Sequence, residues 1–198
     1  MTQSSLVIWM VTLTISVCAI ILSAAAGKPE IHMAMTAFVS TAMALLAIRE
    51  NRQLIGEGAS RSEVAASTAR YMGLVWVWGA LGLLVTYFFI LKWREWAYFF
   101  AGFAALGTLC LLIAATLDRD AKKGTDDETM MKIGRALSWG QLVGMLITMI
   151  GLIVDGKMTR FLNPAKFGDW AANNIFFFGA LALAAISLNA LMATRPKT

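Results

Sequence analysis

Long apolar runs alternate with short polar segments along this chain, and the length of the runs predicts helices that cross a membrane. A spanning helix needs about 20 mostly apolar residues, because each residue rises ~1.5 Å and the hydrocarbon core is ~30 Å thick. Six runs meet this requirement without any Asp, Glu, Lys or Arg: 6–26, 31–48, 71–91, 96–117, 137–154 and 171–192. They lack the alternating pattern of barrel strands, and backbone groups in lipid must be hydrogen-bonded internally. The pattern predicts an all-α polytopic membrane protein with six transmembrane helices in one bundle, a single domain over 1–198.

The basic residues divide unevenly between the two predicted sides of the membrane. Eleven of the 17 Lys and Arg residues lie in the segments 49–70 and 118–136 and in the C-terminal tail, and six lie in the other three connections. The positive-inside rule therefore places both termini in the cytoplasm. The first run, 6–26, is longer than the ~7–15-residue core of a signal peptide, so we expect it to be a retained span.

The composition supports a membrane protein and limits the metal and cofactor sites that the chain could form. Hydrophobic residues make up 59% of the chain and charged residues only 15%, against about 25% charged in a soluble domain. The net charge of +5 lies between the runs, so we interpret it as a topology signal and expect no nucleic-acid partner. One His excludes a two-His metal site or a bis-His haem within one chain, and Cys18 and Cys110 lie in separate runs. We expect no metal and no cofactor.

The two long cytoplasmic segments resemble each other at a shift of 65 residues. Ser60–Glu63 then lies over Thr125–Glu128, and Arg70 lies over Arg135. Both four-residue stretches have the pattern of a capping box, with a hydroxyl residue followed three positions later by Glu, which predicts a helix start. This similarity suggests a tandem helix-loop-helix repeat over 31–91 and 96–154, with a chance match of two capped helix starts as the alternative.

Polar stripes on the second and fifth runs are the candidates for a pathway or a ligand-binding face. They comprise His32, Thr36 and Ser40 in the second run, and Gln141, Thr148 and Asp155 on the fifth. A second set of small residues is predicted to bring helices close together: Gly79, Gly140, Gly144 and Gly151. Because Gln and Thr commonly hydrogen-bond neighbouring helices, we favour helix packing over a pathway for the fifth run.

His32 is the one residue that could carry acid–base or metal chemistry at a membrane surface. Together with Met35, three positions later, it could offer imidazole and thioether ligands to Cu(I). No carboxylate or second His accompanies it in its run, so an interfacial His with one hydrogen bond is the simpler interpretation. The chain has no Gly-rich phosphate loop and no H-E-x-x-H motif, and we assign no catalytic residue.

These features predict a non-catalytic membrane accessory, scaffold or assembly component that packs against other membrane proteins or copies of itself. Four arginines are expected at the cytoplasmic membrane surface: Arg49, Arg52, Arg70 and Arg135. The alternative is a channel or facilitator for a small neutral or weakly polar solute, lined by the second and fifth runs. A membrane enzyme or copper-handling protein that uses His32 is a third hypothesis. The small size and short connections favour a bacterial inner membrane.

Overall fold

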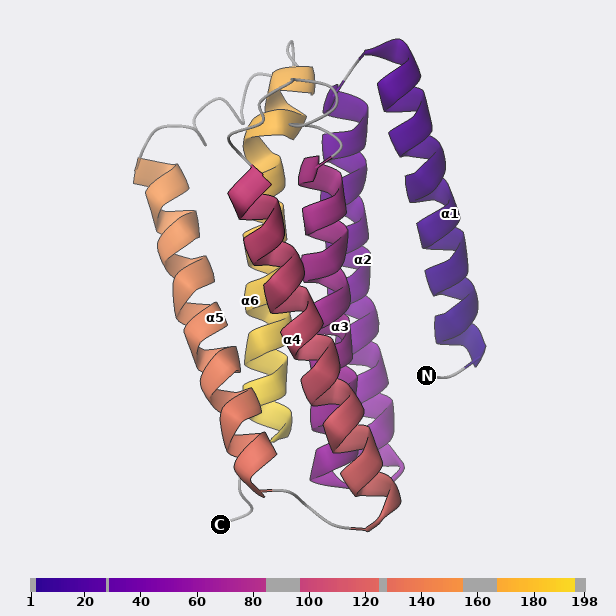
Figure 1. Ribbon diagram of the computed structural model, residues 1–198, viewed down its shortest axis with the longest axis vertical. Helices are drawn as coiled ribbons and strands as arrows, with labels where there is room; N and C mark the ends of the chain where they lie inside the picture. Colours follow the sequence, from indigo (N-terminus) through magenta and orange to yellow (C-terminus); the bar gives the residue numbers. More distant parts are fainter. Residues whose placement is uncertain (1–2, 28, 85–96, 125–127, 155–166, 195–198) are drawn as a thin grey trace.

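The computed structural model describes residues 3–27, 29–84, 97–124, 128–154 and 167–194, and these ranges are all-helical, without a strand (Figure 1). The helices are α1 (Gln3–Ala26), α2 (Pro29–Gly56), α3 (Arg61–Leu83), α4 (Ala97–Lys122), α5 (Glu128–Val154) and α6 (Phe167–Ala193). Each predicted apolar run corresponds to one of these helices. The prediction of an all-α protein is confirmed.

Successive helices run in opposite directions, so the polar ends of several helices meet at one end of the bundle (Figure 1). The turn between α2 and α3, the end of α4, the start of α5 and the end of α6 lie together at the bottom of the bundle in Figure 1. Every charged side chain that the structure describes belongs to residues 49–70 or 118–135, at this same end. We call it the charged end. The charged residues predicted for the opposite side lie outside the described side chains, so the predicted division of charge between the two sides stays a prediction.

The segment 49–70, predicted as a connecting segment, is mostly helix. α2 continues past Ile48 to Gly56, and the turn includes Gly58 at a φ of 75°, where a side chain would be strained. α3 begins with the predicted capping box: Ser60 Oγ accepts a hydrogen bond from the Glu63 backbone N–H, and Glu63 Oε2 accepts one from the Ser60 N–H. The matching box that begins at Thr125 lies outside the described residues.

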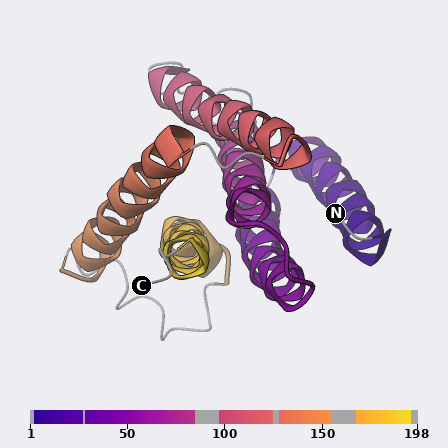
Figure 2. The ribbon, with the colours of Figure 1, turned by 90° about the horizontal axis from the view of Figure 1, so that it is seen from below.

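α6 lies between α2 and α5 and packs against both, as the view along the bundle shows (Figure 2). α3 and α4 form the most extensive helix pair, and α1 packs against α2. α4 and α5 touch only slightly, whereas α2 and α3 pack extensively. The two halves of the predicted repeat therefore pack differently, and their common origin stays a prediction.

Two glycines bring the α3 and α4 backbones into contact. A Cβ added at Gly73 would lie 2.8 Å from the carbonyl oxygen of Gly107, and one added at Gly107 would lie 2.9 Å from that of Gly73. The glycines predicted to mediate packing are Gly79, Gly140, Gly144 and Gly151, and a Cβ at each would meet no atom within 4 Å. Within the described chain, the close approach therefore occurs at a different pair of glycines.

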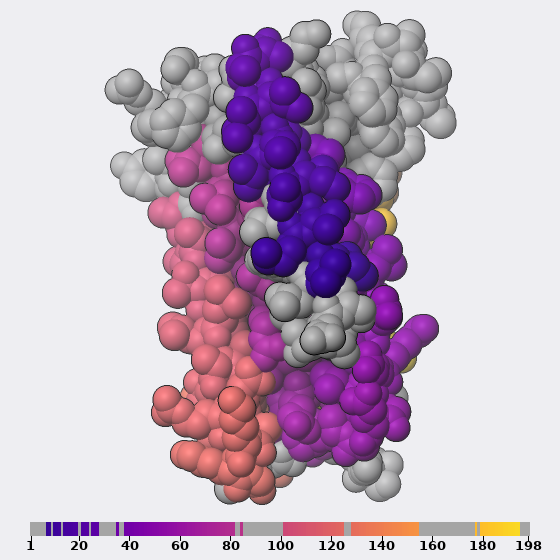
Figure 3. All heavy atoms as spheres, turned by 90° about the vertical axis from the view of Figure 1, so that its right-hand side faces the viewer, coloured from indigo at the N-terminus to yellow at the C-terminus, as the bar shows by residue number. Residues whose placement is uncertain are grey.

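The outer surface of the bundle is apolar, whereas small polar residues lie inside. On α1, Ser16 and Ser23 are fully buried while Val7 and Ile21 are about 60% exposed, and Figure 3 shows this helix on the outside of the bundle. Two helices among the described segments are long and apolar enough to cross a membrane: Ala101–Lys122 and Glu128–Val154, with mean hydropathies of 1.8 and 1.9. This finding supports membrane association through two helices, and the six-span arrangement stays a proposal.

Candidate functional site

Polar side chains meet between α2, α3 and α6 near the charged end, and we call them the inner polar cluster. They are Glu50, Asn51, Ser67, Thr68, Tyr71 and Asn189. The carboxylate of Glu50, a residue only 3% exposed, accepts a hydrogen bond from the Tyr71 hydroxyl at 2.8 Å and one from the Ser67 hydroxyl at 3.4 Å. A buried carboxylate is costly unless it is hydrogen-bonded, so these contacts stabilise the packing of α2 against α3.

Asn51 joins three helices within the inner polar cluster. Its Nδ2 donates to Thr68 Oγ1 on α3 at 2.7 Å and to Asn189 Oδ1 on α6, and the residue is fully buried. Its own Oδ1 is buried without a hydrogen-bond partner. Both Nδ2 hydrogens are therefore used in holding α2, α3 and α6 together.

Gln141 forms a second bridge, between α5 and the rest of the bundle. Its Oε1 accepts from Trp76 Nε1 on α3 at 2.7 Å, and its Nε2 donates to Ser187 Oγ on α6 at 2.8 Å and to the Leu183 carbonyl at 3.2 Å. The Trp76 ring also packs against Phe103 of α4, with ring centroids 4.9 Å apart. The amide of Gln141 is thus occupied by protein groups on two neighbouring helices.

Replacing Gln141 by Leu is expected to lower the free energy of unfolding by about 1–2 kcal/mol, because the buried Trp76 N–H loses its acceptor. The measurement is a denaturant titration of the purified protein in detergent micelles. Thr148→Val is the matched control on the same helix, because the exposed Thr148 hydroxyl donates to its own helix at Gly144 O. Equal stability of the two variants would contradict the assigned role of Gln141.

The two predicted pathway stripes do not face each other in the described part of the chain. Ser40 is buried on α2, Gln141 points to α3 and α6, and α6 separates α2 from α5. Thr148 is exposed. Asp155 lies outside the described residues, and the side chains of His32 and Thr36 lie outside the described part of α2. Among the three candidates whose side chains the structure describes, Ser40, Gln141 and Thr148, no contact is formed between the two stripes.

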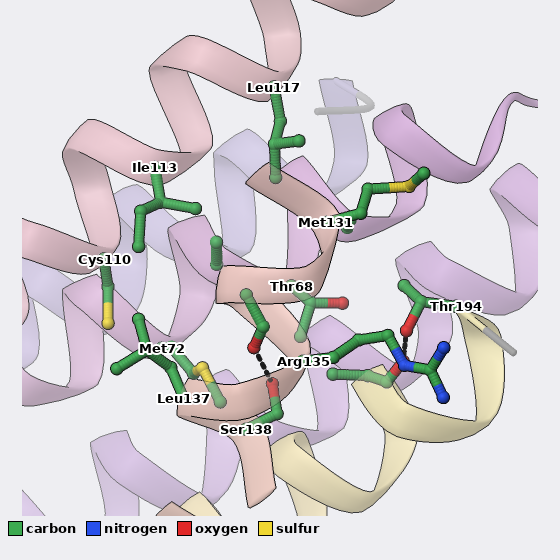
Figure 4. Close-up of a pocket in the computed structure, with 14 residues that line it drawn as sticks. Thr68, Met72, Cys110, Ile113, Leu117, Met131, Arg135, Leu137, Ser138 and Thr194 are labelled. Carbon is green, nitrogen blue, oxygen red and sulfur yellow. Dashed lines mark hydrogen bonds between the residues drawn. The ribbon is translucent and has the colours of Figure 1, made fainter. Parts of the chain in front are cut away.

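The four predicted surface arginines have different environments. Arg49 and Arg52 are exposed on the part of α2 nearest the charged end. Arg70 is half-buried and forms an ion pair with Asp118, which links α3 to α4. Arg135 is half-buried on α5 and lines a groove between α3, α4, α5 and α6 (Figure 4).

That groove has mostly apolar walls. They include Met72 of α3, Ile113 and Leu117 of α4, and Leu137 of α5. The space between the walls is about 440 Å³ with the open solvent at its mouth included, and the centre of a water-sized sphere fits in about 30 Å³ of it. This is room for about two water molecules, so the groove is narrow.

None of the six residues of the inner polar cluster was predicted as a site residue, and Glu50, Asn51 and Asn189 make its contacts on α2 and α6. The predicted apolar run ends at Ile48, where charged residues begin. A helical continuation was nevertheless readable from the sequence, because Ala47, Asn51 and Leu54 recur at steps of four and three. Nothing local in the sequence shows that Asn51 meets Asn189, which is 138 positions away.

Fold and site together define an all-helical bundle with an apolar exterior and hydrogen-bonded polar groups inside. No protein-family model, curated protein or solved structure matches the chain. Among the described residues, no group of three or more His, Cys, Asp or Glu side chains is placed to hold a metal ion.

Proposed function

We propose that the protein is a six-span integral membrane protein with both termini in the cytoplasm of a bacterial cell. The helices contain 23 to 28 residues, and each contains most or part of a predicted apolar run of about 20 residues, the length that crosses ~30 Å of hydrocarbon. The apolar exterior suits lipid, and 11 of the 17 Lys and Arg residues lie in the segments of the charged end and in the C-terminal tail. The excess of Lys and Arg at that end supports its cytoplasmic location.

Within that membrane, we propose a non-catalytic role as an accessory or assembly component that packs against another membrane protein or a second copy. The observation that carries this proposal is the uncovered face of α5. α6 covers one side of α5, but Val143, Ile147 and Ile150 are between 48% and 65% exposed. Gly140 and Gly144 lie beside them with open space where a Cβ would be. Such small-residue positions allow another helix to approach closely.

A solute pathway is less well supported by the same geometry. Gln141, the most polar residue of the fifth-run stripe, is hydrogen-bonded to protein rather than facing a cavity. α6 separates the two stripes, and the groove has only about 30 Å³ in which the centre of a water-sized sphere fits. These features favour polar groups that join helices over polar groups that line a passage.

The test is photo-cross-linking in native membranes from a reactive side chain at position 147, with position 21 of α1 as control. Ile147 and Ile21 have similar exposure, 65% and 60%. We expect a discrete protein adduct from position 147 and only lipid adducts from position 21. Gly144→Leu is expected to abolish the protein adduct without unfolding the bundle, because a Cβ there meets no atom within 4 Å. Absence of any protein adduct at position 147 would contradict the proposal.

A further inference from the structure

We propose that the groove between α3, α4, α5 and α6 binds part of one acyl chain of an anionic phospholipid, with the lipid phosphate on Arg135. The inference rests on the proposed function, since it takes the charged end to lie at the cytoplasmic membrane surface. α4 and α5 each line the groove but touch each other only slightly, which leaves the space between them open. The occupant is a lipid of the cytoplasmic leaflet.

The shape and lining of the groove suit a hydrocarbon chain. Its walls include positions 110–117 of α4 and 131–138 of α5, so it follows these helices for about two turns, or ~10 Å. Ile113, Leu117 and Leu137 make the lining apolar. A groove in which the centre of a water-sized sphere fits in only about 30 Å³ is narrow, which suits part of a flexible hydrocarbon chain better than a compact polar solute.

Arg135 is the one charged residue among the described residues that line the groove. In Figure 4 its guanidinium points away from Met72 and Cys110 and lies near Thr194. No hydrogen bond or ion pair joins Arg135 to another described residue, whereas Arg70 pairs with Asp118 and Arg61 donates to the Thr194 carbonyl at 3.0 Å. A guanidinium has the planar donor geometry that binds phosphate oxygens in a bidentate manner.

The segment around Arg135 carries charges of both signs, because residues 118–135 contain five Lys and Arg residues and five Asp and Glu residues. The attraction for an anionic headgroup therefore comes from the guanidinium of Arg135 itself. The apolar part of the groove extends from the charged end toward the middle of the bundle, which is the direction that the acyl chain of a cytoplasmic-leaflet lipid takes.

The experiment measures lipid retention by native mass spectrometry on protein extracted from vesicles of phosphatidylcholine mixed with phosphatidylglycerol. The wild-type protein is expected to retain one phosphatidylglycerol in preference to phosphatidylcholine. Arg135→Gln is expected to weaken that retention about tenfold, the effect of losing one charged hydrogen-bonding group. Arg52→Gln removes the same charge from an exposed position of α2 and is expected to retain the lipid.

A second pair of variants tests the apolar part of the groove. Gly134 lines the groove, and a Cβ there meets no atom within 4 Å, so Gly134→Leu fills the space with little strain. Gly102→Leu on α4 is the control, since Gly102 is exposed, also has open space around it and does not line the groove. We expect the first variant to lose the lipid and the second to keep it.

Flotation of the same samples with their vesicles separates the two ways in which the inference can fail. If the protein floats with the vesicles but retains both lipids equally, the lipid site is overturned and the membrane proposal stands. The same holds if the Arg135→Gln and Gly134→Leu variants retain as much phosphatidylglycerol as the wild-type protein. Protein that does not float with vesicles of either composition overturns the membrane proposal and the lipid site with it.

Discussion

Replacing Gly107 by Ala is expected to destabilise the bundle by about 2–3 kcal/mol, the upper part of the range for overpacked cores. The added Cβ would lie 2.7 Å from Val77 Cγ2 and 2.9 Å from both the Val77 nitrogen and the Gly73 carbonyl oxygen. Two of these three atoms belong to the backbone, so rotation of a side chain cannot relieve the contact. α3 and α4 would have to move apart along the most extensive helix pair in the bundle.

The measurement is the free energy of unfolding in detergent micelles, with matched glycines as controls. Gly102→Ala lies on the same helix in open space and is expected to be neutral or to stabilise by about 0.5–1 kcal/mol through helix propensity. Gly73→Ala and Gly79→Ala form the corresponding pair on α3, with a loss expected only for Gly73→Ala. If Gly107→Ala were as stable as Gly102→Ala, the close α3–α4 contact would be contradicted.

Replacing Asn51 by Asp is expected to cost about 3 kcal/mol, because it places an uncompensated carboxylate in a fully buried position. The Nδ2 group that donates to Thr68 and Asn189 would become an oxygen that cannot donate. The new charge would also lie next in sequence to Glu50, whose carboxylate is already buried.

Gln53→Glu is the control for the Asn51→Asp variant, since it makes the same chemical change two residues later on the exposed surface of α2. Gln53 donates to Glu57 at 2.8 Å, so a second carboxylate there is expected to cost only about 0.2–0.5 kcal/mol. Thermal unfolding followed by circular dichroism in micelles compares the two variants. Similar losses in both would show that Asn51 does not join α2, α3 and α6 as described.

The positions of the helices could be predicted from the sequence because their cause is local. An apolar run of about 20 residues can satisfy its backbone hydrogen bonds within itself, and each predicted run overlaps one helix. The ends were predicted less well, because charge marks where a chain leaves lipid but not where a helix ends. α2 continues through Glu50 and Asn51 to Gly56, stabilised by its contacts with α3 and α6.

The contacts between helices depend on where their axes cross, which no local pattern specifies. Gly140 and Gly144 have the small-residue spacing that predicts close packing, yet the close approach is at Gly73 and Gly107 on different helices. Gln141 was identified as a polar group on a helix face, but its partners lie 42 to 65 positions away in the sequence. Only the folded arrangement reveals them.

The most direct test of the six-span account is labelling of single cysteines in intact bacterial cells with a membrane-impermeant maleimide, after Cys18 and Cys110 are replaced by Ala. The cysteines are placed one at a time in the predicted connections: at Lys28, Arg94 and Lys157 on one side, and at Glu57, Lys123 and Lys197 on the other. The account predicts that the first three react in intact cells and that the last three react only after the membrane is permeabilised. Reaction of Glu57→Cys or Lys197→Cys in intact cells, or equal reaction at all six positions, would contradict it.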